Sequence, residues 1–333
     1  MPEPLLSVNN LITEFETDEG RVRAVDDISF SVEAGETLGI VGESGCGKSV
    51  TALSIMRLLP QPMGQIMGGE IKLQGEDLTR LDLPRMGKIR GNDIGMVFQE
   101  PMTALNPVHT IGRQLAEVLF LHKNINKEQA LRESIEMLDK VGIPSPDVRM
   151  GEYPHQLSGG MRQRVVIAIA LACQPKLLIA DEPTTALDVT IQAQILELIK
   201  DLQNDMGMSV ILITHDLAVI AETSQSVVVM YAGKVAEKGS VFDVFDNPTH
   251  PYTQGLLSSI PRLETEPKSV LSTIDGMVPG LLDLPVGCRF ENRCAYHKQD
   301  CTKASPQIEQ VSGAHQVSCF EWRNVKQELQ SSG

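Results

Sequence analysis

The stretch Gly42-Glu43-Ser44-Gly45-Cys46-Gly47-Lys48-Ser49 decides how the rest of this 333-residue sequence is interpreted. It matches the pattern G-x-x-x-x-G-K-S at every fixed position. An apolar segment, Leu38 to Val41, precedes it, and a helical segment from Lys48 to about Leu59 follows. In such a setting the glycines let backbone N–H groups turn inward around phosphate, and the helix N-terminus adds positive potential. The pattern predicts a phosphate-binding loop in which Lys48 reaches the β- and γ-phosphates of a nucleotide and Ser49 binds Mg²⁺.

An acidic pair follows a second apolar run. Leu177 to Ala180 is typical of a buried strand, and Asp181 and Glu182 come directly after it. Carboxylates at the C-terminal end of a strand face the crevice in which α/β sheets bind ligands. Alone, such a pair is commonly part of a solvated loop. Together with the phosphate loop it predicts that Asp181 holds Mg²⁺ through water and that Glu182 orients or deprotonates an attacking water.

Continuous apolar runs at 177–180, 210–213 and 227–230 are typical of buried parallel strands. Helical segments separate them, which predicts an α/β fold with a mostly parallel sheet. A helix-rich insert spans about residues 100–172. We expect a main domain over residues 1–245 and a small, turn-rich C-terminal extension over residues 246–333.

Composition excludes several classes of protein. Apolar residues make up 42% of the chain, enough for a full core, so intrinsic disorder is excluded. The 43 acidic and 29 basic residues give a net charge of −14, which argues against a general nucleic-acid binder and against adsorption to anionic lipid. No run of about 18 apolar residues occurs, so we expect no membrane span. Met1 to Asn10 lacks the features of a signal peptide, which predicts an intracellular protein.

Four of the six cysteines crowd one short stretch: Cys288, Cys294, Cys301 and Cys319. Disulfides are rare in a reducing compartment, so the group predicts a metal site. Its spacing, C-x5-C-x6-C-x17-C, lacks the close C-x2-C pair usual for zinc and matches no standard ferredoxin run. Zinc and an iron–sulfur cluster are both compatible with this chemistry.

The segment Leu157-Ser158-Gly159-Gly160-Met161 precedes a helix that runs to about Cys173. Ser158 fits the N-cap position, where its hydroxyl accepts a hydrogen bond from the first turn. The same hydroxyl and the free backbone amides would also suit an anion. The spacing alone is compatible with both roles.

Taken in order, these motifs resemble those of the ATP-binding cassette ATPases, the motors of ABC transporters, over nearly the whole chain. Leu157 to Met161 resembles the signature L-S-G-G-Q, with Met161 in place of Gln. The resemblance implies a glutamine loop at Gln99, which would contact Mg²⁺ and the reacting water, and a switch histidine at His215. Further counterparts are Ala186-Leu187-Asp188, the loop after the catalytic acid, and Phe15, which would stack on adenine.

The family resemblance also implies an architecture and partners. A mixed or parallel sheet core would carry an antiparallel β subdomain and a helical subdomain. Two cassettes would dimerise head to tail, so that Ser158, Gly159 and Gly160 of one cover the ATP of the other. The second cassette is commonly a paralogue. Two transmembrane permease subunits would bind near Gln99–Leu105 at the cytoplasmic face of the inner membrane, with a substrate-binding protein as an indirect partner.

The C-terminal sequence resembles a subgroup, the ATPases of dipeptide and oligopeptide importers. The resemblance rests on Asn247–Thr253, Pro279-Gly280, Gly287–Phe320 and the glutamine-loop stretch Phe98–Pro107. It implies ATP-driven peptide import and favours a [4Fe-4S] cluster over Zn²⁺ at the four cysteines. Importers of the same subclass for a nickel complex, glutathione or an antimicrobial peptide stay open. An ABC protein of translation or DNA repair is a weaker alternative, because those usually carry two cassettes or a long coiled coil.

Overall fold

The computed structural model describes residues 3–99, 104–185, 187–260 and 273–332. The chain forms two compact units. The phosphate-loop unit contains Leu6–Ser31, Thr37–Thr79 and Thr214–Gly333, and the helical unit contains Met1–Leu5, Val32–Glu36 and Arg80–Ile213.

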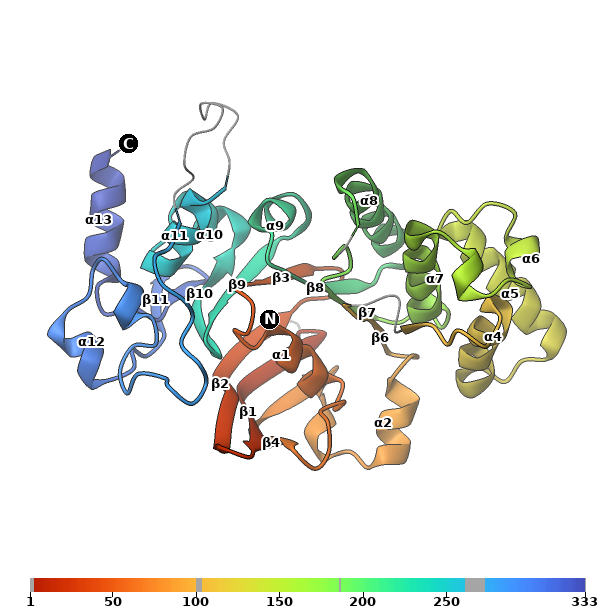
Figure 1. Cartoon of the computed structure of the whole chain (residues 1–333), viewed down its shortest axis with the longest axis horizontal. Coiled ribbons are helices and arrows are strands. Elements are labelled where there is room, and N and C mark those ends of the chain that lie inside the picture. Colours follow the sequence, from red (N-terminus) through yellow and green to blue (C-terminus); the bar gives the residue numbers. More distant parts are fainter. Residues whose placement is uncertain (1–2, 100–103, 186, 261–272, 333) are drawn as a thin grey trace. The chain divides into compact units, whose positions relative to one another are not determined.

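The phosphate-loop unit begins with an antiparallel sheet, drawn in red and orange in Figure 1. Its strands lie in the order β2-β1-β4-β5. Alternate residues of β1 are buried, as expected for a strand with one face on the core. The strands are β1 (Leu6–Thr17), β2 (Gly20–Val32), β4 (Gly64–Leu73) and β5 (Glu76–Asp77).

A second set of strands in this unit carries the phosphate loop. The fully buried β3 (Thr37–Val41) pairs in parallel with β9 (Ser226–Tyr231). Beyond β9, the strands β10 (Lys234–Ser240), β12 (His315–Val317) and β11 (Glu309–Ser312) pair antiparallel. The C-terminal residues therefore extend this sheet. The helices are α1 (Lys48–Ile55), α9 (Leu217–Thr223), α10 (Val241–Asp246), α11 (Pro251–Ser258), α12 (Gln299–Lys303) and α13 (Trp322–Ser332).

The helical unit is built on three parallel strands, β6 (Ile94–Val97), β7 (Leu177–Asp181) and β8 (Ser209–Thr214). Helices α4, α5 and α7 pack on one another, and α6 packs on α5 (Figure 1, yellow and green). A capping box between Asn126 and Gln129 begins α5. The helices are α2 (Leu83–Ile89), α4 (Ile111–His122), α5 (Lys127–Lys140), α6 (Pro146–Arg149), α7 (Gly159–Leu171) and α8 (Val189–Met206).

The predicted α/β fold is confirmed, and parallel and antiparallel pairs both occur. One local prediction was wrong. The helix after the phosphate loop ends at Ile55 rather than near Leu59, because Arg57 adopts a left-handed backbone and Pro60 disfavours a helical residue before it. Strand β4 begins at Gly64, where the glycine leaves room for the Phe15 ring on the paired strand β1.

In the described part of the chain, no helix has both the length and the apolar character needed to cross a membrane.

Candidate functional site

The predicted phosphate loop connects β3 to α1, and its glycines are required by space. A Cβ atom on Gly42 would lie 2.2 Å from the carbonyl oxygen of Met230, and one on Gly47 would lie 2.6 Å from that of Ala24. Both glycines also have a positive φ, 152° and 100°. Only glycine fits these two positions, so the loop backbone can form the tight cradle that a phosphate group requires.

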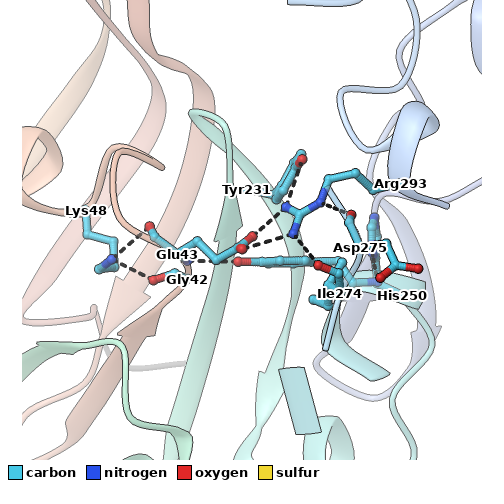
Figure 2. A network of polar contacts seen from close by, with 9 residues as sticks. Gly42, Glu43, Lys48, Tyr231, His250, Ile274, Asp275 and Arg293 are labelled. Carbon is cyan, nitrogen blue, oxygen red and sulfur yellow. Dashed lines mark hydrogen bonds and ion pairs between the residues drawn. The ribbon is translucent and has the colours of Figure 1, made fainter. Parts of the chain in front are cut away.

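Lys48, the first residue of α1, folds back over this loop. Its side chain is buried, and Nζ donates to the carbonyl oxygens of Gly42 at 2.6 Å and Glu43 at 3.1 Å (Figure 2). Burial raises the pKa of the neighbouring Cys46 thiol. The loop thus holds a lysine ammonium by its own carbonyls, at the place where the motif predicts phosphate binding.

The predicted catalytic acid lies in the helical unit. Asp181 ends β7 and is 4% exposed. Glu182, the next residue, has a left-handed φ of 46°, a conformation that is costly without glycine and tends to occur at functional sites. Its carboxylate oxygen Oε2 accepts hydrogen bonds from Gln99 Nε2 at 3.1 Å and from Thr185 Oγ1 at 2.9 Å. The structure therefore brings together Gln99 and Glu182, two of the predicted catalytic residues.

The signature segment is also in the helical unit. Ser158 is the N-cap of α7, and its hydroxyl accepts from the backbone N–H of Met161 at 3.3 Å. The capping prediction is thereby confirmed. Ser158 and Gly159 are exposed, and the space beside Gly159 is open. The N-terminus of this 13-residue helix is therefore accessible to a bound anion or a partner.

Sequence reasoning missed Gln163, which links α7 to the catalytic strand end. Its side chain is 1% exposed, and Nε2 donates to the carbonyl oxygen of Pro183, the residue after Glu182, at 2.5 Å. Its Oε1 atom has no hydrogen-bond partner among the described residues. Gln163 follows the signature segment by two residues, a spacing that could have suggested a supporting role.

The remaining predicted residues divide between the units. Phe15 and His215 belong to the phosphate-loop unit with Gly42–Ser49. His215 is exposed, and the following Asp216, not His215, caps α9 through the N–H groups of Ala218 and Val219. In the helical unit, Asp188 caps α8. The predictions for Ala186 and for residues 100–103 lie outside the described residues.

The four C-terminal cysteines are free thiols that lie near one another. The backbone N–H of Cys288 donates to the carbonyl oxygen of Cys301 at 2.7 Å. Burial, together with the charge of the other cysteines, raises the pKa of Cys288 to about 11 and that of Cys319 to about 12.

No group of three or more His, Cys, Asp or Glu side chains in the described ranges is arranged to hold a metal ion. Cys301 is buried, and Cys288, Cys294 and Cys319 are half-buried. The predicted metal site is therefore not confirmed by the structure.

Comparison with known families gives two matches. Residues 25–185 match the family described as ABC transporter, and residues 236–301 match the family described as oligopeptide/dipeptide transporter, C-terminal region. The two matched regions include the phosphate loop, the signature, the catalytic strand end and three of the four clustered cysteines.

Curated relatives match over nearly the full length. A putative peptide import ATP-binding protein of Brucella melitensis is 53% identical, over 97% of this chain and 98% of the relative. The dipeptide transport ATP-binding protein DppD of Bacillus subtilis is 54% identical, over 96% of this chain and 95% of the relative. Among solved structures, a dimeric ATP-binding cassette in a post-hydrolysis state, bound to ADP and Pi, is similar with a TM-score of 0.63. It is 28% identical and covers 71% of this chain and 98% of its own. The chain therefore belongs to the ABC transporter ATP-binding proteins of the dipeptide and oligopeptide import group.

Proposed function

We propose that this protein hydrolyses ATP to power the import of dipeptides or oligopeptides through separate membrane subunits. The observation that carries the proposal is the pairing of Gln99 with Glu182 in one unit and a glycine-required phosphate loop with a buried lysine in the other. The relatives named above are peptide import proteins, which supports peptides over a nickel complex, glutathione or an antimicrobial peptide as cargo. We further propose that the chain acts at the cytoplasmic face of the membrane.

Each residue has a distinct role in this proposal. The loop amides and Lys48 bind the β- and γ-phosphates, and Phe15 stacks on adenine. The oxygen atoms of Ser49, Asp181 and Gln99 are ligands of the kind that Mg²⁺ prefers, and the bound ion would neutralise charge on the phosphates. Glu182 orients and deprotonates the attacking water. His215 donates a hydrogen bond to the γ-phosphate.

Two copies of such a cassette would act together, with a paralogue as the second copy. Ser158, Gly159 and Gly160 would bind the γ-phosphate of the nucleotide held by the partner cassette. The exposed N-terminus of α7 supports this role, because its first amide groups lack intrahelical partners and favour an anion. The similar solved cassette was itself determined as a dimer.

The permease subunits would dock on the helical unit. A groove of about 880 Å³ lies on α4, with further lining from α5 and from Met150 and Gly151, and exposes the apolar side chains of Phe120, Leu121 and Leu131. Most of the predicted contact segment near Gln99–Leu105 lies outside the described residues. We propose that this groove receives a helical segment of a permease, whose apolar face would cover these three side chains.

We propose that the C-terminal extension begins near residue 245. It would hold a [4Fe-4S] cluster, or alternatively Zn²⁺, through four cysteines: Cys288, Cys294, Cys301 and Cys319. The support is the donor set of four neighbouring cysteines. Anaerobic purification with iron, sulfide and zinc analysis tests this. Iron and sulfide at about four per chain would support the cluster, zinc at one per chain would replace it, and absence of all three would remove the metal site.

The proposed activity is tested by ATP hydrolysis in the assembly purified through this chain. Glu182→Gln keeps the size of the side chain and removes the base, so we expect ATP binding to persist. We expect turnover to fall by about 10²–10⁴-fold, as for loss of a general base. Unchanged turnover would contradict the role of Glu182.

A further inference from the structure

Glu43, the second residue of the phosphate loop, is held by side chains from the C-terminal region, residues 246–333. The guanidinium of Arg293 donates to both carboxylate oxygens of Glu43, from Nη1 to Oε2 at 2.7 Å and from Nη2 to Oε1 at 3.0 Å. The hydroxyl of Tyr252 accepts a hydrogen bond from the backbone N–H of Glu43 at 2.8 Å. Figure 2 shows Lys48, Glu43 and Arg293 in one continuous polar network.

Burial and several hydrogen bonds fix the position of the Arg293 side chain. Its side chain is 4% exposed, and its remaining donors reach the carbonyl oxygens of Ile274 and Asp275 and the hydroxyl of Tyr231. Burial alone would lower its pKa, but the hydrogen bonds and charge of Glu43 hold it above the ordinary value. Bidentate pairs of this kind combine strength with fixed geometry. Arg293 directly precedes Cys294, one of the four clustered cysteines.

Tyr252 belongs to the segment Asn247–Thr253, and its hydrogen bond with Glu43 connects this segment to the phosphate loop. The sequence alone indicated no functional role for the segment. The Tyr252 side chain is fully buried, and its ring contacts those of Tyr231 and Phe290. Its backbone N–H donates to Nδ1 of His250 at 3.0 Å. His250 in turn bonds the backbone of Ser318, the residue before Cys319. Two residues next to cysteines are thus connected to Glu43. Arg293, beside Cys294, bonds it directly, and Ser318, beside Cys319, is linked to it through His250 and Tyr252.

The position of Glu43 matters for ATP because of charge and geometry. A free carboxylate at this position would repel the triphosphate, whereas the paired guanidinium cancels its charge. The carbonyl oxygen of Glu43 also accepts from Lys48 Nζ, so its backbone helps to set where the ammonium lies. Both effects act within the phosphate-loop unit.

We propose that Arg293 and Tyr252 are positioning residues for ATP, through which the C-terminal region fixes Glu43 and thereby sets the nucleotide affinity of the phosphate loop. This proposal rests on ATP binding at Gly42–Ser49. It gives Asn247–Thr253 and the cysteine-bearing segment a part in ATP binding, in addition to any part in folding.

The test is a double-mutant cycle on the full-length chain, with Mg-ATP affinity measured by titration of a fluorescent ATP analogue. Arg293→Met keeps the apolar stem and removes the charge, and we expect affinity to fall at least about tenfold. Glu43→Gln in the Arg293→Met background removes the unpaired carboxylate, so affinity should recover only in part, by the share of the loss that comes from its charge. Tyr252→Phe removes one hydrogen bond and should weaken affinity by about fivefold.

A matched control and two further readouts separate positioning from folding. Arg323→Met removes an exposed C-terminal arginine that pairs with Glu309, and should leave affinity unchanged. Thermal unfolding monitors stability in every variant, and in the assembly the KM for ATP should rise in Arg293→Met while kcat changes less. Folded Arg293→Met with wild-type affinity, or full recovery of affinity in the double variant, would overturn the proposal that Arg293 positions Glu43. A wild-type chain that binds no ATP would instead refute the proposed function.

Discussion

The C-terminal region should lose stability as the pH falls from 7 to 5, and the cause should be His250. This side chain is 4% exposed, and burial lowers its pKa from 6.5 to about 4, although the charge of Glu237 opposes the shift. In the folded protein the ring stays neutral over this range, with Nδ1 accepting from Tyr252. In the unfolded chain it takes up a proton near pH 6.5. Protonation therefore favours the unfolded state, and stability present above pH 6.5 is lost as the pH falls towards 4.

The two pKa values fix the size of the effect. Between pH 7 and pH 5 the free energy of unfolding should fall by about 2 kcal/mol, since each pH unit between the two values contributes about 1.4 kcal/mol. Glu237, the buried carboxylate nearby, also has a lowered pKa, so its own contribution is lost only at lower pH, below about 4.5. Glu237 therefore contributes little between pH 5 and 7, whereas His122, whose pKa burial also lowers, adds a loss in the same direction as that of His250.

Urea unfolding of the full-length chain at pH 7, 6 and 5 measures this effect. His250→Asn keeps a helix-capping acceptor but cannot be protonated, so its stability should be lower at pH 7 and should fall less steeply with pH than that of the wild type. The matched control is His155→Asn, which removes an exposed histidine from the helical unit and should keep the wild-type slope. If His250→Asn lost as much stability as the wild type between pH 7 and pH 5, the assignment to His250 would be refuted.

Three further outcomes are expected. Lys48→Ala removes the buried ammonium from the phosphate loop and should weaken Mg-ATP binding by roughly 10–100-fold in titration, since hydrogen bonds to a charged group are worth about 1.5–3 kcal/mol; wild-type affinity would contradict the loop assignment. Ser158→Arg puts a bulky cation where the γ-phosphate of the partner's ATP must fit, so turnover at the partner's site should fall by about 10²-fold or more. ATP should still bind the phosphate loop of this chain, and loss of that binding would contradict the head-to-tail arrangement. Leu121→Asp places a charge in the apolar groove on the helical unit, so fewer permease subunits should co-purify while ATP affinity stays unchanged. Val189→Asp, a matched change at an exposed position on α8, should leave co-purification unchanged.

Local signals made much of the fold and site predictable. The apolar runs that flank the phosphate loop and the acidic pair specify buried strands, and Asn126 and Ser158 mark the starts of α5 and α7 by the caps they form. The fixed residues of the loop identify it because Gly42 and Gly47 leave no room for a side chain.

The parts that could not be predicted depend on contacts between distant residues. Arg293 and Glu43 are 250 positions apart, and nothing in either neighbourhood indicates that they pair. The start of β4 at Gly64 depends on the room that this glycine leaves for the Phe15 ring, a tertiary contact that is invisible in the sequence. The segment Asn247–Thr253 served only to identify the subgroup. Its position in the fold depends on the buried Glu237, whose carboxylate accepts hydrogen bonds from the backbone N–H groups of Thr249 and His250.

The most direct test of the account is ATP hydrolysis by the complete assembly, purified through this chain and reconstituted with its substrate-binding protein. Hydrolysis should rise when the binding protein is loaded with a short peptide. Replacing Glu182 with Gln in this chain should abolish that rise while ATP binding persists. An ATPase that does not respond to peptides, or a peptide response that survives Glu182→Gln, would contradict the proposal that this chain is the catalytic motor of peptide import.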